Sequence, residues 1–146
     1  VDLTTQTMSS VAGGQLAAAG KDPIDLAKQQ LAGPSDTLYP GAIDALVAAC
    51  ADPRAAAAIN EVIRSHPNAG ARGWAAFQAA TCKDGQTVAA LIHALEKDSA
   101  AGVRKNAADT LGKLAAREAR AALERAQNDP DVSVRGAVGR ALKKLP

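Results

Sequence analysis

The apolar positions in the second half of the chain recur with helical spacing at an interval of about 32 residues. Three segments begin at Arg72, Arg104 and Arg135, and each continues into a stretch whose apolar residues lie four and three positions apart. This spacing places the apolar side chains on one face of a helix, and no stretch alternates convincingly in the manner of a strand. Self-similarity at a constant interval of this length is typical of stacked helical repeats. The pattern therefore predicts an all-α protein.

The apolar positions align from one repeat to the next in two helices of each unit. The aligned sets are Ala75, Ala107 and Val138; Ala79, Leu111 and Leu142; Cys82, Leu114 and Leu145; Ile59, Leu91 and Ala122; and Ile63, Leu95 and Ala126. A degenerate earlier repeat precedes them, with Cys50 in register with Cys82 and with Pro40 at the position of the arginine. The repeats therefore account for most of the chain after about residue 36.

The pattern and the residues that start helices together predict nine helices. Asp22 and Asp52 each precede a proline, and Asp84 precedes a third helix. An aspartate accepts hydrogen bonds from the first N–H groups of a helix, and a proline fits its first turn. The helices are predicted near residues 5–18, 23–31, 38–50, 53–65, 70–82, 85–97, 101–114, 117–128 and 131–144.

The segment from Asp98 to Leu114 reads Asp-(x4)-Val-Arg-(x2)-Ala-Ala-(x2)-Leu-Gly-x-Leu, and the segment from Asp129 to Leu145 is similar. This motif resembles the HEAT-like repeat found in phycobiliprotein lyases and in many unrelated binding proteins. The resemblance implies a right-handed α-solenoid of about four stacked helical hairpins, with a helical N-terminal cap or docking segment. The expected parts are a cap over 1–35 and a repeat domain over 36–146, with units 36–65, 66–97, 98–128 and 129–146.

The resemblance also implies that the aspartates and arginines of the motif bond between or within adjacent units. The residues concerned are Arg72, Asp98, Arg104, Asp129 and Arg135. Chemistry supports a structural role, because a guanidinium can bridge two units and a carboxylate can satisfy the N–H groups at a helix start. At the first clear repeat, His66 stands where the other repeats have an acid, so we expect Arg72 to be less tightly held.

Composition and charge refine this picture. Hydrophobic residues make up 47% of the chain but aromatic residues only 2%, and alanine supplies most of the apolar count. Such a composition favours closely packed helices. The net charge of +2 is uneven, since residues 101–146 hold ten basic and five acidic residues. Nucleic-acid binding through these basic repeats is one alternative, although stacking aromatics are absent there and acids interleave with the basic residues.

Cys50 and Cys82 occupy equivalent positions, so they are a candidate disulfide in an oxidising compartment. Stacked helices usually lie about 8–10 Å apart, whereas a disulfide needs Cα atoms within about 7 Å; small alanine interfaces could close part of that gap. The spacing of the cysteines with His66 and His93 does not fit zinc, and a buried cysteine is a more typical role for Cys82 than a nucleophile paired with His93. We therefore expect no catalytic residue, metal or cofactor.

These observations favour a non-catalytic module that binds another protein or the subunits of a larger assembly. The second helices of successive units line the concave face of such a solenoid. The candidate contact residues on that face are Glu61, Arg64, His93, Glu96, Arg120 and Glu124. Trp74 is a candidate anchor for a partner, or it covers the neighbouring degenerate repeat. A bilin lyase or bilin chaperone is the enzyme class that the resemblance suggests, and the short, aromatic-poor chain argues against it.

The sequence does not fix a compartment. No apolar run reaches the roughly 18–20 residues that a membrane span needs. The chain starts at Val1, which fits a processed chain that is exported or organellar as well as a trimmed one.

Overall fold

The computed structural model describes residues 22–146, and the regular elements of this part of the chain are all helices. The eight α-helices described are α3 (Pro23–Ala32), α4 (Tyr39–Ala48), α5 (Pro53–Ser65), α6 (Ala69–Gln78), α7 (Gly85–Lys97), α8 (Ala101–Lys113), α9 (Arg120–Arg125) and α10 (Val132–Lys144). Short 3₁₀ segments lie at Ala79–Thr81, Arg117–Ala119 and Ala126–Asn128. The predicted all-α class is confirmed.

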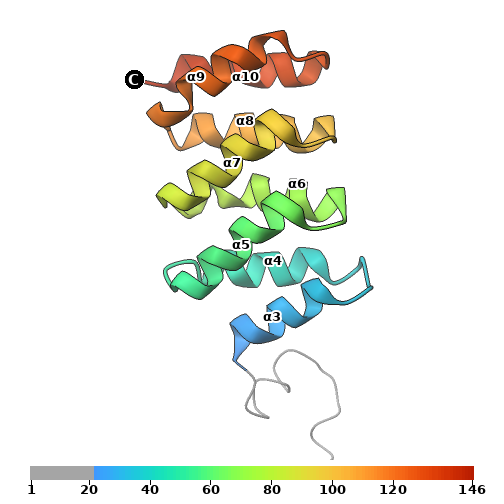
Figure 1. Cartoon of the computed structure of the whole chain (residues 1–146). Helices are drawn as coiled ribbons and strands as arrows, with labels where there is room; N and C mark the ends of the chain where they lie inside the picture. The colour runs from blue at the N-terminus through green and yellow to red at the C-terminus, as the bar shows by residue number, and fades with distance from the viewer. Residues whose placement is uncertain (1–21) are drawn as a thin grey trace, which may run out of the picture.

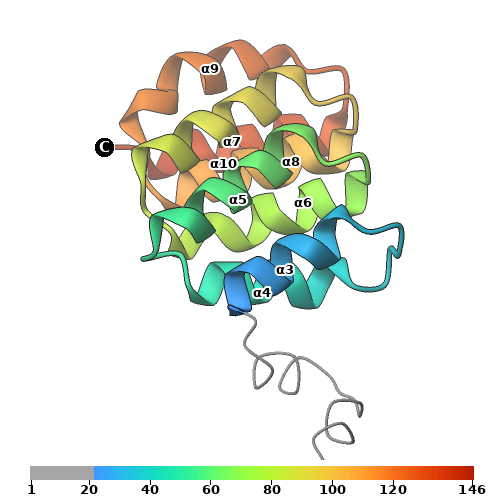
Figure 2. The ribbon, with the colours of Figure 1, turned by 60° about the horizontal axis from the view of Figure 1, so that its bottom comes forward.

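The helices form two layers in a stack of hairpins, as Figure 1 shows. One layer holds α4, α6, α8 and α10, each packed on the next, and the other holds α3, α5, α7 and α9. The view in Figure 2 shows the same two layers from below. The predicted α-solenoid of stacked helical hairpins is therefore confirmed, whereas its division into four units and an N-terminal cap over 1–35 stays a prediction.

The core lies between the two layers and is built from the predicted apolar stripes. Ile59 and Leu91, which are aligned in the second helices, are almost completely buried, and so are Ala75, Ala107 and Val138 in the first helices. Alanine at so many buried positions lets the helices approach closely and costs no side-chain entropy. The stripes of successive repeats therefore join into one continuous core.

The predicted helix starts are confirmed where aspartate precedes the helix. Asp22 accepts hydrogen bonds from the N–H groups of the first turn of α3, while Asp52 and Asp84 do the same for α5 and α7. These carboxylates satisfy donors that a helix cannot satisfy within itself.

Some helix predictions need correction. The helix expected over 117–128 contains only a short α-helix, α9, between two 3₁₀ segments, and the last turn of the helix expected over 70–82 is also 3₁₀. The α8 helix ends in a left-handed residue, Ala115, with φ of 50°. Two backbone bonds close that end, from Ala115 N–H to Gly112 and from Ala116 N–H to Leu111. The helix expected over 5–18 lies outside the described residues.

Gly112 marks the closest approach between α8 and α10. A Cβ atom at this position would lie 2.8 Å from Ala141 Cα, which is closer than packed carbon atoms approach. The motif glycine therefore lets the two helices meet backbone to backbone. Gly139 of α10 differs, because a Cβ there would meet nothing within 4 Å.

We expect Gly112→Ala to lower the free energy of unfolding by about 1–2 kcal/mol, because overpacking outweighs the gain in helix propensity. The control Gly139→Ala should instead raise it by about 0.5–1 kcal/mol. Urea unfolding followed by circular dichroism measures both changes. An equal gain of stability in the two variants would show that α8 and α10 are not in close contact at Gly112.

The structure joins Cys50 and Cys82 in a disulfide. The two Cα atoms lie 6.0 Å apart, closer than the usual separation of packed helices. Nearby alanines are almost completely buried, namely Ala42 of α4, Ala75 of α6 and Ala79 of the 3₁₀ segment after α6. The small side chains let α4 and α6 approach closely enough for the bond.

No helix in the described residues is long and apolar enough to cross a membrane.

Candidate functional site

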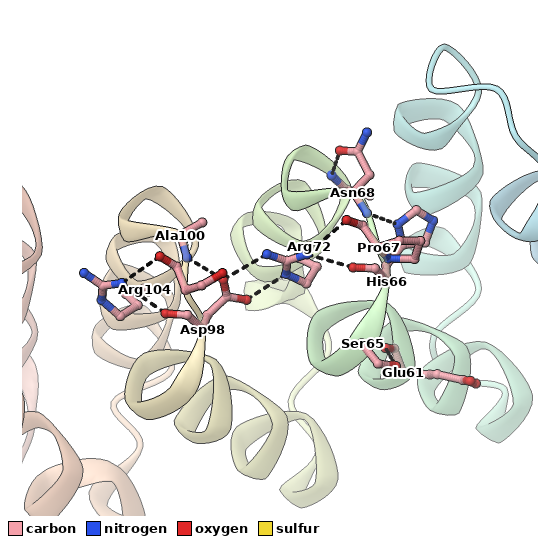
Figure 3. A network of polar contacts seen from close by, with 11 residues as sticks. Glu61, Ser65, His66, Pro67, Asn68, Arg72, Asp98, Ala100 and Arg104 are labelled. Carbon is pink, nitrogen blue, oxygen red and sulfur yellow. Dashed lines mark hydrogen bonds and ion pairs between the residues drawn. The ribbon is translucent and has the colours of Figure 1, made fainter.

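The arginines and aspartates of the repeat motif form structural contacts between successive loops. Arg72 at the start of α6 donates from Nε and Nη2 to the two carboxylate oxygens of Asp98, at 2.8 and 3.1 Å. Its Nη1 donates to the carbonyl oxygen of His66 at 2.8 Å. Asp98 also accepts a hydrogen bond from Ala100 N–H at 2.9 Å. Figure 3 shows that these contacts link two successive loops.

The same arrangement recurs one unit later. Arg104 donates to both carboxylate oxygens of Asp129, at 2.8 and 3.2 Å, and to the carbonyl oxygen of Asp98 at 3.0 Å. Arg135 makes the carbonyl contact alone, to Asp129 at 2.7 Å, and pairs with no carboxylate in the described residues. We call this series of contacts the arginine ladder. It ties the loops of successive units together along one edge of the stack.

The expectation that Arg72 is less tightly held is wrong. Arg72 and Arg104 each take their carboxylate from the following unit and only carbonyl oxygens from their own, so His66 does not have to supply an acid. His66 instead donates from Nε2 to the carbonyl oxygen of Leu31 at 3.0 Å, while its Nδ1 accepts from Asn68 N–H at 3.0 Å. In the later units an aspartate at the position of His66 accepts hydrogen bonds from the arginine of the preceding unit. The unit before His66 has Pro40 in place of that arginine, so a side chain that donates to Leu31 suits this position better than a carboxylate.

The ladder holds its carboxylates in the charged form. Burial alone would raise the pKa of Asp98, and this is the largest single influence on it. Hydrogen bonds from Arg72 and Ala100 N–H, with the charges of Arg72 and Arg104, outweigh burial and hold the pKa of Asp98 below its ordinary value. The pKa of Asp129 is lowered for the same reasons, with Arg104 as the donor.

A group whose pKa is lower in the folded than in the unfolded protein stabilises the fold above its unfolded pKa, here about 4. This contribution is lost as the pH falls further towards the folded pKa. We therefore expect Asp98→Asn to be less stable than wild type by about 2 kcal/mol at pH 7, with the difference shrinking from about pH 4 downward. Urea unfolding at a series of pH values measures it, and a difference independent of pH would contradict the ladder.

The predicted contact residues lie on the exposed side of the second-helix layer. We call this surface the second-helix face, and it comprises Glu61, Arg64, His93, Glu96, Arg120 and Glu124. His93 is half-buried and the other five are exposed. Two are already engaged, because Glu96 pairs with Arg125 and Arg120 donates to the carbonyl oxygen of Pro146 at 2.9 Å. The remaining four pair with no charged group in the described residues.

Hollows open along this face beside α5. One of about 460 Å³ lies between α5 and α7, with Glu61 and Arg64 in its wall. A second, of about 320 Å³, lies where α5 and α7 end, and Arg64, His93 and Lys97 line it. A third, of about 340 Å³, lies between α3 and α5. The face is therefore recessed between its helices, and the hollow at the ends of α5 and α7 is the most polar of the three.

Sequence analysis did not identify Lys97 as a residue of this face. Lys97 follows His93 by one helical turn on α7, and this spacing places the two on one side of the helix. The candidates occupy equivalent positions in successive second helices, such as Arg64 and Glu96, whereas Lys97 is equivalent to Ser65. The i, i+4 spacing was the signal that could have found it.

Trp74 belongs to α6 in the other layer, and its side chain reaches α4. Its Nε1 donates to Asp44 Oδ1 at 2.8 Å, and its ring stacks on that of Phe77 with the centroids 5.7 Å apart. The ring is half-buried and packs against the core. Trp74 therefore covers part of the degenerate repeat, and Phe77 next to it is the more exposed ring.

The basic residues of the C-terminal repeats are partly neutralised. Four of the ten in residues 101–146 pair with carboxylates, namely Arg104, Lys105, Arg125 and Arg140. Another, Lys113, lies over the Phe77 ring at 4.8 Å. The four ion pairs reduce the positive charge that a continuous phosphate track would need.

The structure also places the residues that were weighed for nucleophilic catalysis and metal binding. Cys82 is bonded to Cys50, so it is not a thiolate that His93 could activate. In residues 22–146, no group of three or more histidine, cysteine, aspartate or glutamate side chains is placed to hold a metal ion.

Comparisons with known proteins agree with the fold. Residues 56–143, more than half of the chain, match the model of the family described as HEAT repeats. The chain is also similar to the solved structure of human deoxyhypusine hydroxylase in complex with glycerol, with a TM-score of 0.73 and 25% sequence identity. That match covers 86% of this chain but only 44% of the hydroxylase chain. No curated protein sequence matches.

Proposed function

We propose, from the premise that this chain belongs to the HEAT repeat family, that it is a non-catalytic module that binds another protein through the second-helix face. HEAT repeats generally mediate protein interactions. The family match is to HEAT repeats in general and does not reach the phycobiliprotein-lyase type. Since this chain spans less than half of deoxyhypusine hydroxylase, the activity of that enzyme is not carried over.

One observation supports the choice of face. Glu61, Arg64 and Glu124 are exposed charged residues that pair with no charged group in the described part of the chain. The arginine ladder, in contrast, uses its charges to tie units together, and its side chains are 5–14% exposed at the two complete rungs. The charges of the ladder are thus engaged with one another inside the fold, whereas Glu61, Arg64 and Glu124 are exposed and free to meet a partner.

A face carried on packed helices also suits binding. Each of Glu61, His93 and Glu124 has a buried neighbour one residue away, which holds its backbone in place, and these neighbours are Val62, Ala94 and Leu123. Side chains on rigid helices lose less freedom on association than side chains on loops, so more of the contact energy appears as affinity.

Affinity capture from a native lysate tests the proposal. The variant Glu61→Lys/His93→Glu/Glu124→Lys disturbs the face at three helices. The control Ala45→Lys/Ala48→Lys/Thr81→Lys changes the net charge by the same amount at exposed positions of the other layer. We expect a protein that wild type and control capture and the face variant does not. Equal capture by all three forms would place the binding site elsewhere, and a reproducible turnover lost on one substitution would contradict the non-catalytic role.

A further inference from the structure

The groove at the ends of α5 and α7 is the part of the second-helix face with the most specific chemistry. We propose that it binds the carboxylates of an acidic segment of the partner protein, through Arg64, His93 and Lys97. This inference rests on the proposed function and names the partner's chemistry. The groove has a volume of about 320 Å³ and lies over the Arg72–Asp98 rung of the ladder.

The three groups come from two helices and converge on one recess. Arg64 lies in the last turn of α5, and Lys97 lies in the last turn of α7, one turn after His93. No ion pair joins Arg64 or Lys97 to an acid in the described residues. Two flexible cationic side chains therefore flank a half-buried imidazole, which can donate a hydrogen bond to an oxygen.

The surroundings of the groove leave this positive charge in place. The ends of α5 and α7 each carry about half a negative charge from the helix dipole, which only partly offsets a full charge on each cation. The Arg72–Asp98 pair in the wall is neutral as a whole. Of the nearby acids, Glu61 lines the two neighbouring hollows instead, and Glu96 is paired with Arg125.

The size and composition of the recess favour carboxylates on a peptide over a nucleic-acid strand. Nucleic acid without sequence preference is held by a long basic groove with aromatic rings for the bases to stack on. This groove is short, and no phenylalanine, tyrosine or tryptophan lines it. An extended acidic segment can place one or two side chains in it and continue along α5 and α7.

Calorimetric titration with a capped hexaglutamate peptide at low salt tests the proposal. The variant Arg64→Glu/Lys97→Glu reverses the groove. The control Lys143→Glu/Lys144→Glu makes the same charge change in the last turn of α10, so both variants place two acids at helix ends. Circular dichroism of both variants verifies that they are folded.

We expect saturable binding to wild type, at least about tenfold weaker binding to the groove variant, and a change below about twofold in the control. Added salt should weaken the binding to wild type. Absence of binding to wild type, or equal losses in both variants, would overturn the proposal. So would a capped oligothymidylate that binds the groove more tightly than the peptide. If the peptide fails while captured protein is still lost in the face variant, the acidic partner is wrong and the proposed function stands.

Discussion

Replacing Arg104 with alanine is expected to lower the free energy of unfolding by about 3 kcal/mol. The substitution leaves the Asp129 carboxylate, whose side chain is 8% exposed, without the guanidinium that meets both of its oxygens. It also removes the donor to the carbonyl oxygen of Asp98. A nearly buried charge without its partner costs more than the net value of the ion pair, because the desolvation of the carboxylate is then uncompensated. Arg72→Ala should have a similar effect through Asp98.

Arg135→Ala provides the matched comparison. Arg135 holds the same place in its repeat, but it is exposed and donates only to a carbonyl oxygen in the described residues. Its loss should cost less than about 1 kcal/mol. Urea unfolding of the three variants at pH 7 measures the differences. Similar losses for Arg104→Ala and Arg135→Ala would show that the carboxylate half of the rung contributes little to stability.

Reduction of the Cys50–Cys82 disulfide is expected to lower the free energy of unfolding by about 3–4 kcal/mol. The bond closes a loop with a sequence separation of 32, and cross-linking a loop of this length restricts the unfolded chain by about that amount. It also joins α4 of the degenerate repeat to the end of α6. Unfolding of the oxidised protein and of the same protein with reductant gives the difference directly.

The variant Cys50→Ala/Cys82→Ala serves as the control for the reductant. Its stability should lie near that of reduced wild type and should not respond to reductant, because it has no bond to break. Equal stability of the wild-type protein with reductant, when its thiols react, and without reductant, when they do not, would contradict the expected contribution of the bond.

The repeated apolar spacing was sufficient to predict the fold, because the same positions face the core in every unit. Leu91 and Leu111 are examples, since each lies at its predicted stripe position and is completely buried. The helix over 117–128 was predicted less well. Its alanines support both α-helical and 3₁₀ turns, and the turn at Ala115 that precedes it adopts a conformation that alanine sequence does not signal.

The direction of the ladder could not be predicted from sequence. The motif places an aspartate six residues before Arg104 and before Arg135, so Asp98 and Arg104 are near neighbours in the chain. In the structure the carboxylate of Asp98 nevertheless bonds to Arg72 of the preceding unit, 26 residues away. Only the stacking of one loop on the next brings these groups together, and spacing within one repeat carries no information on it.

The residues of the second-helix face could be chosen from helical periodicity, but the groove could not. Arg64 and Lys97 belong to different columns of the repeat, and they meet because α5 and α7 end side by side above one rung of the ladder. Such a recess depends on the angle and offset between two helices, which a pattern along the chain does not contain.

Carboxylate labelling of the captured complex tests the central claim most directly. Glycine ethyl ester and carbodiimide modify exposed acids, and mass spectrometry compares each site in the free protein with the same site in the complex. On our account Glu61 and Glu124 lose labelling on binding, while Asp36 and Asp44, which lie off the second-helix face, keep it. Protection of Asp36 and Asp44 with unchanged labelling of Glu61 and Glu124 would contradict the account.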